Sequence, residues 1–183
     1  YNSIFTSSDL LTGTDRVAEA AEKLDYDIFV NLQGDEPMVD PKDILKAIEY
    51  KKKYRDYVIN SYSLLSNSED SANRNLPKVI TNENDELIYM SRAQIPLSKE
   101  ISNLEINYKK QVCIYAYSRD QLRLFRKFGR NSKIENIEDI EILRFFELSI
   151  KIKMFETLYP SLAVDVIADV ERVEKELSLK KDL

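Results

Sequence analysis

A strand that runs directly into a turn and then into a capped helix constrains the fold of this chain more than any other feature. Residues 27–32 (DIFVNL) form an apolar run of strand length, which ends at Gln33-Gly34. Asp40 then offers an N-cap side chain, and Pro41 occupies the first helical position, where no backbone N–H is needed. A strand followed closely by a helix is typical of βαβ units with a parallel sheet.

The remaining apolar patterns extend this arrangement along the chain. They predict a strand at residues 3–6, a helix that Thr14 or Asp15 caps, and a helix that Ser118 caps. Further helices are predicted over residues 137–148 and 167–177, and further strands over residues 57–65, 77–81, 86–90, 111–117, 150–155 and 162–164. We therefore predict one α/β domain over residues 1–183, with a mixed, mostly parallel sheet and an antiparallel insertion.

The scarcity of three residue types excludes several kinds of chemistry. The chain contains no histidine, so a Ser-His-Asp triad, a Cys-His dyad and a His-ligated metal are ruled out. Its single cysteine, Cys113, rules out an intramolecular disulfide, is typical of a reducing compartment and is expected to serve in packing. With three glycines, these residues hold no GxGxxG or Walker loop. The chemistry must rest on carboxylates, amides, arginine, lysine and tyrosine.

Charge and hydropathy argue against nucleic-acid and membrane partners. The 27 basic and 32 acidic residues give a net charge of −5, which is unsuited to a general nucleic-acid-binding surface. The basic tract over residues 51–55 fits a solvated helix end or, as an alternative, a phosphate-binding patch. No apolar run approaches the ~20 residues of a membrane span, and no signal-peptide pattern occurs within these residues. We expect a cytoplasmic protein.

Two aspartates follow predicted strands and are candidate metal ligands. Asp35 comes directly after Gly34 at the carboxyl end of the 27–32 strand, where ligands collect in open α/β sheets. Asp165 follows the predicted 162–164 strand. Two carboxylates at neighbouring strand ends suit a hard cation such as Mg²⁺, and the alternative is that either aspartate only caps a helix. Gly34 is expected to permit a tight turn and close ligand approach.

Three other motifs offer polar groups to the same edge of the sheet. Gly13-Thr14-Asp15-Arg16 joins a loop to a helix N-terminus, whose N–H groups favour anions, although helix capping alone also explains this motif. Arg92 follows a predicted strand and can bind a carboxylate or phosphate, or can form an ordinary salt bridge. In the 111–117 strand, alternation gives one polar face, which carries Gln111, Cys113, Tyr115 and Tyr117.

Five motifs stand in a specific order along the chain. They are Gly13-Thr14-Asp15-Arg16, Asn31-Leu32-Gln33-Gly34-Asp35-Glu36-Pro37, Ser91-Arg92-Ala93-Gln94-Ile95-Pro96, Ile114-Tyr115-Ala116-Tyr117 and Val164-Asp165. Over essentially its whole length the chain resembles the 3-deoxy-manno-octulosonate cytidylyltransferases, the CMP-Kdo synthetases. The resemblance implies a Rossmann-like nucleotidyltransferase fold, Mg²⁺ as cofactor and a homodimer. The implied activity is transfer of CMP from CTP to the anomeric hydroxyl of Kdo or a related acidic sugar, with release of pyrophosphate, for lipopolysaccharide or capsule biosynthesis.

The resemblance also implies roles for individual residues. Asp35 and Asp165 would act in catalysis by holding Mg²⁺ at the α-phosphate. The nucleotide would be bound by Gly13, Thr14, Asp15 and Arg16. Phosphoryl transfer depends on positioning and charge neutralisation, so the chemistry needs no histidine or reactive cysteine. The sugar pocket would be lined by Gln33, Arg92, Gln111, Tyr115, Glu141 and Ile142, with Arg92 expected to bind the sugar carboxylate.

Three departures from the family pattern bear on activity. Gln111 stands where the family usually has a histidine, so hydrogen bonding is kept and a positive charge is lost. Ile142 follows Glu141 where the family has a glutamine, which removes two donors and an acceptor. The family's first strand and basic, glycine-rich phosphate loop are not among these residues. Because the sequence starts at Tyr1 and not at Met, we expect it to be part of a longer chain, and we do not expect these residues alone to catalyse well.

Three functional hypotheses follow. The first is CMP transfer to Kdo or a variant octulosonate, the variant being favoured by the changes at Gln111 and Ile142 because polar pocket groups discriminate between sugars. The second is CMP activation of another acid, such as a sialic-acid-like sugar or a phosphonate. The third is a non-catalytic remnant that binds a sugar or nucleotide without the phosphate loop. For a homodimer, we expect the interface at the antiparallel insertion near residues 92–96.

Overall fold

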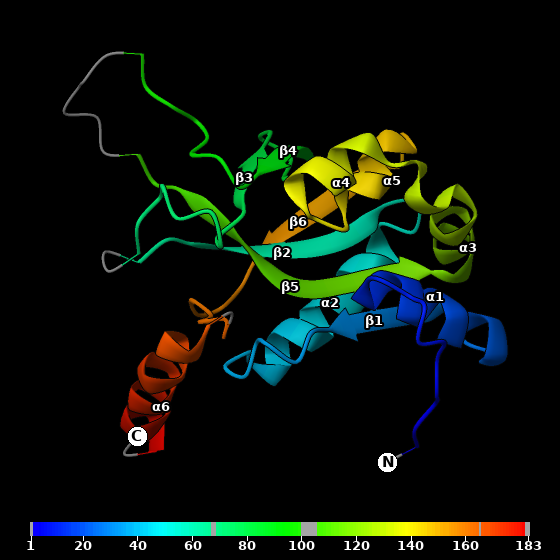
Figure 1. The fold of residues 1–183 in the computed structure, drawn as a ribbon, viewed down its shortest axis with the longest axis horizontal. Coiled ribbons are helices and arrows are strands. Elements are labelled where there is room, and N and C mark those ends of the chain that lie inside the picture. Colours follow the sequence, from blue (N-terminus) through cyan, green and yellow to red (C-terminus); the bar gives the residue numbers. More distant parts are fainter. Residues whose placement is uncertain (1, 67–68, 100–105, 165, 182–183) are drawn as a thin grey trace.

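The computed structural model contains both helices and strands and describes residues 2–66, 69–99, 106–164 and 166–181 (Figure 1). The helices are α1 (Gly13–Lys23), α2 (Pro41–Lys53), α3 (Arg119–Phe128), α4 (Lys133–Glu138), α5 (Leu143–Glu147) and α6 (Ile167–Lys181), with a 3₁₀ turn, η1, at Gly129–Asn131. The strands are β1 (Ile28–Leu32), β2 (Val58–Leu64), β3 (Lys78–Thr81), β4 (Leu87–Ser91), β5 (Lys109–Ser118) and β6 (Ile152–Glu156). All six strands were expected from the apolar patterns, to within two residues at each end.

The strands form one mixed sheet, which confirms the predicted α/β fold class. Within the described ranges it has six strands in the order β4-β3-β5-β2-β6, and β1 also pairs with β5. β5 runs antiparallel to β1, β2 and β3, and β6 is parallel to β2, so β1, β2, β3 and β6 share one direction. A simple βαβ unit would place β1 beside β2, whereas β5 lies between them (Figure 1). The antiparallel insertion therefore includes the central strand.

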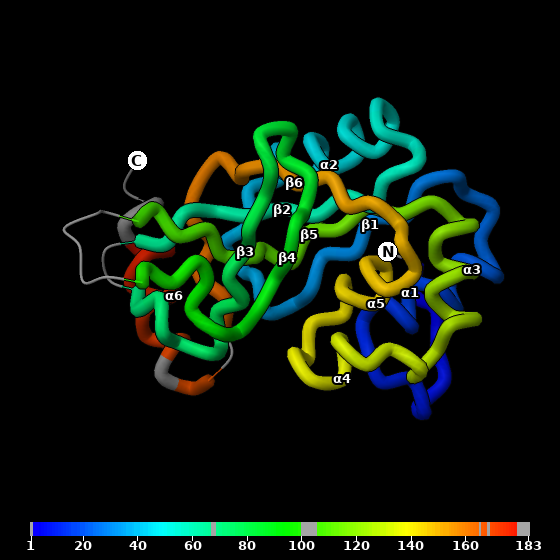
Figure 2. Tube along the Cα trace, turned by 90° about the horizontal axis from the view of Figure 1, so that it is seen from above, coloured from blue at the N-terminus to red at the C-terminus, as the bar shows by residue number. Residues whose placement is uncertain are grey.

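Helices cover both faces of the sheet. On one face, α2 packs over a small apolar cluster of Ala47, Ile59, Val112, Ile114, Ala116 and Phe155. The larger core lies on the other face, where α1, α3 and α5 gather at one end of the sheet (Figure 2). The alternation along β5 confirms the predicted two-faced strand, because Val112 and Ile114 face α2 while Tyr115 and Tyr117 enter the larger core.

Three helix starts show how local sequence sets the element boundaries. Asp40 caps α2 by accepting from Lys42 N, and Ser118 forms a capping box with Gln121 at the start of α3, as predicted. The predicted cap of α1 was wrong. Thr12, in an extended conformation, accepts from Asp15 N, so the helix begins at Gly13, earlier than a cap at Thr14 or Asp15 allows, and includes the whole Gly13–Arg16 motif in its first turn.

Three other predicted elements differ from the structure. Residues 3–6 form no strand, because no segment in the described ranges pairs with them and Phe5 is 92% exposed. Residues 162–164 are also irregular. The single helix predicted over residues 137–148 is two short helices, because Asp139 adopts a left-handed conformation (φ 52°) that ends α4. Glu141 and Ile142 consequently lie between α4 and α5.

The C-terminal helix α6 stands apart from the sheet (Figure 1). Among the side chains of α6 that the structure describes, Val173 alone is buried. Across the described ranges, no helix combines the length and the apolar character that crossing a lipid bilayer requires.

Candidate functional site

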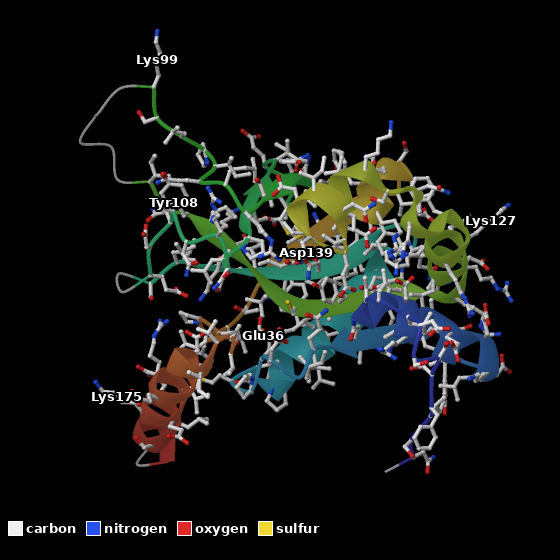
Figure 3. All side chains as sticks on the ribbon, viewed as in Figure 1. Glu36, Lys99, Tyr108, Lys127, Asp139 and Lys175 are labelled. Carbon is white, nitrogen blue, oxygen red and sulfur yellow. The ribbon has the colours of Figure 1, made fainter. Side chains whose placement is uncertain are left out.

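A small polar pocket of about 140 Å³ lies beyond the carboxyl end of β1. It brings together six of the residues that the sequence singled out, namely Gln33, Asp35, Arg92, Gln111, Tyr115 and Glu141. These side chains come from the turn after β1, the end of β4, strand β5 and the turn between α4 and α5. Figure 3 labels two further lining residues, Glu36 and Asp139, near the middle of the molecule. The site is therefore built from segments far apart in the sequence.

Glu141 joins the pocket to the N-terminus of α1. Its Oε1 accepts from Gly13 N at 3.1 Å and from Gln33 Nε2 at 3.1 Å, and its Oε2 accepts from Thr14 N at 2.8 Å. A carboxylate at this position satisfies backbone donors that have no partner within the helix and complements the helix dipole. The N–H groups predicted to bind nucleotide are therefore occupied by a side chain of the protein.

Gly13 closely approaches two side chains at this junction. A Cβ atom on Gly13 would lie 3.3 Å from Gln33 Nε2, which is tighter than ordinary contact, and 3.6 Å from Glu141 Oε1, which is an ordinary contact distance. At Gly34, by contrast, a Cβ would meet no atom within 4 Å and the backbone is not left-handed. The tight turn expected at Gly34 thus does not depend on glycine, although the open space beside it is compatible with close ligand approach.

The other members of the predicted nucleotide motif make structural contacts. Thr14 is fully buried, and its hydroxyl hydrogen-bonds to that of Tyr117 at 3.0 Å. Asp15 pairs with buried Arg144 at 2.8 Å. Arg16 donates to three oxygens of residues 6–10, which it holds against α1. None of these three side chains lines the pocket.

Arg92 is fixed by backbone carbonyls. Its Nε donates to Glu138 O at 2.6 Å, its Nη2 to Asp139 O at 2.7 Å and its Nη1 to Arg74 O at 3.0 Å. These bonds fasten the left-handed turn at Asp139 to the end of β4. The alternative, an ordinary salt bridge, is also present: Arg92 Nη2 lies 3.4 Å from Asp139 Oδ2. This ion pair is weak, because the Asp139 side chain is exposed to solvent. The guanidinium nevertheless places a fixed positive charge on the pocket wall.

Gln111 and Tyr115 stand side by side on the polar face of β5. Gln111 Nε2 donates to the Tyr115 hydroxyl at 3.2 Å and to Asn60 Oδ1 at 3.1 Å. The Tyr115 ring is buried and stacks on Tyr117, with centroids 6.0 Å apart and planes 12° apart. Burial raises the pKa of Tyr115 well above its ordinary value, so this hydroxyl stays protonated.

Asp35 offers the pocket a carboxylate oxygen that has no partner in the described part of the chain. Its Oδ1 is buried and accepts no hydrogen bond there, which is unusual for a buried polar atom. Its backbone carbonyl accepts from Val164 N at 2.8 Å, so the 157–164 segment passes directly beside it. Asp165, the other predicted ligand, lies outside the described residues. Within those residues, no group of three or more acidic or cysteine side chains forms a metal cluster.

Glu36 is a buried acid that the sequence analysis did not single out. Its Oε1 accepts from Cys113 N at 3.0 Å, and its Oε2 accepts from the Ser161 hydroxyl. Burial raises the pKa of Glu36 above its ordinary value. Lys110 Nζ also donates to Ser161 O at 2.8 Å, so two side chains hold the 157–164 segment against β5. The position of Glu36, directly after Asp35 in the turn that follows β1, was the sequence signal that could have identified it.

Two further expectations concern Ile142, which is buried, and Cys113, which is half-buried and lines the pocket. Ile142 is 0% exposed and belongs to the larger core, so it does not line the pocket as expected. It lies where α5 begins, and its apolar side chain packs with the core instead of facing the polar site. Burial strongly raises the pKa of the Cys113 thiol, which agrees with a packing function.

The fold is that of nucleotidyltransferases. A Bacillus anthracis protein described as a glucose-1-phosphate thymidylyltransferase, in complex with sucrose, superposes with a TM-score of 0.62 over 97% of this chain and 64% of its own, at 11% identity. The match shows the fold alone. Together, the sheet and this match define the fold class as the Rossmann-like fold of nucleotidyltransferases.

Sequence comparison narrows this class. A family model described as cytidylyltransferase matches residues 2–152. A 3-deoxy-manno-octulosonate cytidylyltransferase of Christiangramia forsetii is 38% identical over 169 residues, which are 91% of this chain and 67% of that protein. The structure of CMP:2-keto-3-deoxy-manno-octonic acid synthetase complexed with CTP superposes with a TM-score of 0.84, at 32% identity, over 97% of this chain and 72% of its own. The chain belongs to the cytidylyltransferase family, among the 3-deoxy-manno-octulosonate cytidylyltransferases.

Proposed function

We propose that the protein carrying this chain transfers CMP from CTP to the anomeric hydroxyl of Kdo or a closely related acidic sugar. The hydroxyl oxygen bonds to the α-phosphorus, the bond from that phosphorus to the pyrophosphate oxygen breaks, and the hydroxyl proton is lost as pyrophosphate leaves. The observation that carries this proposal is the pocket, which gathers Gln33, Arg92, Gln111, Tyr115 and Glu141 in a chain that belongs to this family.

The chain's own residues suit recognition of an acidic polyol. Gln33, Gln111 and Tyr115 offer neutral donors and acceptors, which match sugar hydroxyls. Arg92 supplies a positive charge for an anionic group while the three carbonyls hold its guanidinium in place. Glu141 fixes the Gln33 amide through a 3.1 Å hydrogen bond. Their function is to bind and orient the sugar, because the reaction needs no protein nucleophile.

We propose further that Asp35 and Asp165 hold Mg²⁺. The buried Asp35 Oδ1, which lacks a partner in the described ranges, fits a hard cation that prefers carboxylate oxygens. Bound Mg²⁺ would neutralise phosphate charge and lower the pKa of a coordinated hydroxyl. The hydrogen bond from Val164 N to Asp35 O at 2.8 Å brings the 157–164 segment beside Asp35.

A homodimer in the cytoplasm, acting in lipopolysaccharide or capsule biosynthesis, completes the proposal. The antiparallel insertion near residues 92–96 is the proposed interface, supported by Leu97 and Ile88, whose side chains are 74% and 51% exposed. Light scattering on the full-length protein would give twice the monomer mass. The paired change Ile88→Lys with Leu97→Lys would give the monomer mass, and an unchanged mass would place the interface elsewhere.

Mg²⁺-dependent release of pyrophosphate from CTP tests the proposed reaction. The full-length protein is assayed with Kdo, a sialic acid and a phosphonate as acceptors. We expect Kdo or a close variant to give the highest kcat/KM, and a preference for either other acid would replace this substrate assignment. Asp35→Ala should abolish release, whereas Asp120→Asn, at an exposed carboxylate of α3, should retain it. Full activity of Asp35→Ala would make the metal assignment wrong.

A further inference from the structure

Asn60 is a wholly buried amide in the middle of the central strand pair. It lies at a β-bulge, where the register between β2 and β5 shifts between Asn60 and Ser61. Its Nδ2 donates to Val112 O at 3.1 Å and to Ile114 O at 2.9 Å. Backbone carbonyls can only accept hydrogen bonds, so these two contacts determine which end of the Asn60 amide is nitrogen.

The orientation of Asn60 sets that of Gln111. With Nδ2 committed to the bulge, Asn60 presents its Oδ1, a pure acceptor, to Gln111. Gln111 must therefore turn its amide nitrogen toward Asn60, and the same nitrogen also donates to the Tyr115 hydroxyl. The opposite orientation would bring two amide oxygens together at 3.1 Å without a proton between them.

The remaining polar atom of Gln111 is its Oε1. Gln111 lines the pocket, and within the described ranges no hydrogen bond to this oxygen occurs. The wall behind it is rigid, because Tyr115 stacks on Tyr117 and the Tyr117 hydroxyl is tied to Thr14. Gln111 Oε1 is thus an uncharged acceptor on the pocket wall. Its direction is set, through Asn60, by backbone carbonyls of β5.

We infer that Asn60 is a positioning residue that makes Gln111 a selective acceptor for a donating hydroxyl of the sugar. This inference rests on the proposed function and specifies its substrate class: at this position the ligand carries an O–H or N–H donor and not an ether, a fluorine or an anionic oxygen. A pocket group that requires a donor discriminates strongly against a ligand without one, because that ligand covers the acceptor and leaves it unpaired.

Deoxyfluoro and deoxy analogues of the acidic sugar test whether the pocket requires a hydrogen-bond donor on the ligand at Gln111. Fluorine is close to a hydroxyl in size but cannot donate, so for one hydroxyl position the full-length wild-type protein should lose about 10- to 100-fold in kcat/KM with either analogue. Asn60→Ala should raise the KM for the parent sugar, leave the KM for CTP unchanged and reduce that discrimination to within about threefold. Tolerance of fluorine at every position by the wild-type protein would overturn the inference.

Ser61→Ala is the matched control. The Ser61 hydroxyl is as buried as Asn60 and donates to the same Val112 O at 3.0 Å, but among the described residues it makes no hydrogen bond to Gln111. Both variants should lose stability, and only Asn60→Ala should change the sugar discrimination. An equal change in sugar discrimination in both variants would show that Asn60 has only a structural role.

A readout without substrate separates this inference from the proposed function. In the ligand-free protein labelled with ¹⁵N-glutamine, the side-chain NH₂ of Gln111 should show slow exchange with water, and Asn60→Ala should remove that protection while Ser61→Ala retains it. Protection together with absent pyrophosphate release would support the positioning by Asn60 and refute the proposed reaction. A Gln111 amide that exchanges freely in the wild-type protein would overturn the inference whatever the activity.

Discussion

Glu141 Oε2 accepts a hydrogen bond from the backbone N–H of Thr14 at 2.8 Å, across 127 residues of sequence. With the parallel bond from Gly13 N, this contact makes Glu141 a second cap of α1 beside Thr12, and it ties the turn between α4 and α5 to the first turn of α1. The same carboxylate accepts from Gln33, so one side chain serves both helix stability and the geometry of the pocket.

Removal of this cap should weaken folding and sugar binding together. Glu141→Ala leaves two helix N–H groups without their acceptor, and we expect a loss of about 1–2 kcal/mol in the free energy of unfolding. Urea denaturation measures it. Glu49→Gln, at an exposed site on α2, should stay within about 0.5 kcal/mol of wild type. If both variants are equally stable, the contact with α1 contributes nothing.

A methyl group at Gly13 should disturb the pocket more than the fold. The gain in helix propensity on Gly13→Ala, up to about 1 kcal/mol, opposes the strain of a Cβ placed 3.3 Å from Gln33 Nε2. We therefore expect a change in unfolding free energy below about 1 kcal/mol and a clear rise in the KM for the sugar. Gly34→Ala is the matched variant, because its Cβ meets no atom within 4 Å and stability should be unchanged. An unaltered sugar KM in Gly13→Ala would show that Gln33 moves aside freely.

Arg144 should be the most costly polar residue to replace. It is 2% exposed, its Nε and Nη2 each lie 2.6 Å from the Glu135 carboxylate, and its Nη1 pairs with Asp15. The guanidinium also lies 3.6 Å from the centre of the Phe125 ring. Arg144→Met leaves the buried Glu135 carboxylate and the half-buried Asp15 carboxylate without their cation, and we expect a loss of about 3–5 kcal/mol in urea unfolding.

An exposed ion pair provides the comparison for Arg144. Arg123 pairs with Asp120 at 3.2 Å, with both side chains more than half exposed. Arg123→Met should therefore cost below about 1 kcal/mol. Similar losses in the two variants would contradict the importance of the buried network.

Glu36 should make stability fall as pH rises. Burial raises its pKa in the folded protein above the ordinary value of 4.5, so between these two pKa values the folded state holds the proton that the unfolded state has released. The stabilisation is fully present below about pH 4.5 and is lost as pH passes the raised pKa. Glu36→Gln retains acceptor and donor capacity without titrating, so its stability relative to wild type should increase with pH in this window. A difference that is constant between pH 4 and pH 7.5 would contradict the assignment.

The local signals in the sequence were sufficient for most of the fold. Asp40-Pro41 and Ser118 mark helix starts because their side chains act on neighbouring backbone groups. The break at Asp139 escaped prediction, because its left-handed backbone is supported by Arg92, which donates to Asp139 O from the end of β4. A contact of that kind leaves no trace in the local periodicity.

The sequence predicted most of the residues that line the candidate site, but it did not predict the contacts that these residues make. Gln33, Arg92 and Gln111 line one pocket, as the motifs suggested. That Glu141 would occupy the N-terminus of α1, and that Ile142 beside it would turn into the core, depends on how α4, α5 and α1 pack. The sequence analysis did not identify a role for Asn60. The available signal was its amide within the predicted 57–65 strand, and the structure shows that this amide is buried.

The position of β5 has a consequence for how the chain folds as it is synthesised. Within the described residues, β1 pairs only with β5, while β2 pairs with β5 and β6. The two early strands, β1 and β2, therefore do not pair with each other. Both leave the ribosome well before residues 109–118. We expect the sheet to close only when β5 emerges and joins them, a late, long-range step that is slow and leaves strand edges open to misassociation. Chaperones that shield apolar strands should therefore matter most for this protein during that interval of translation.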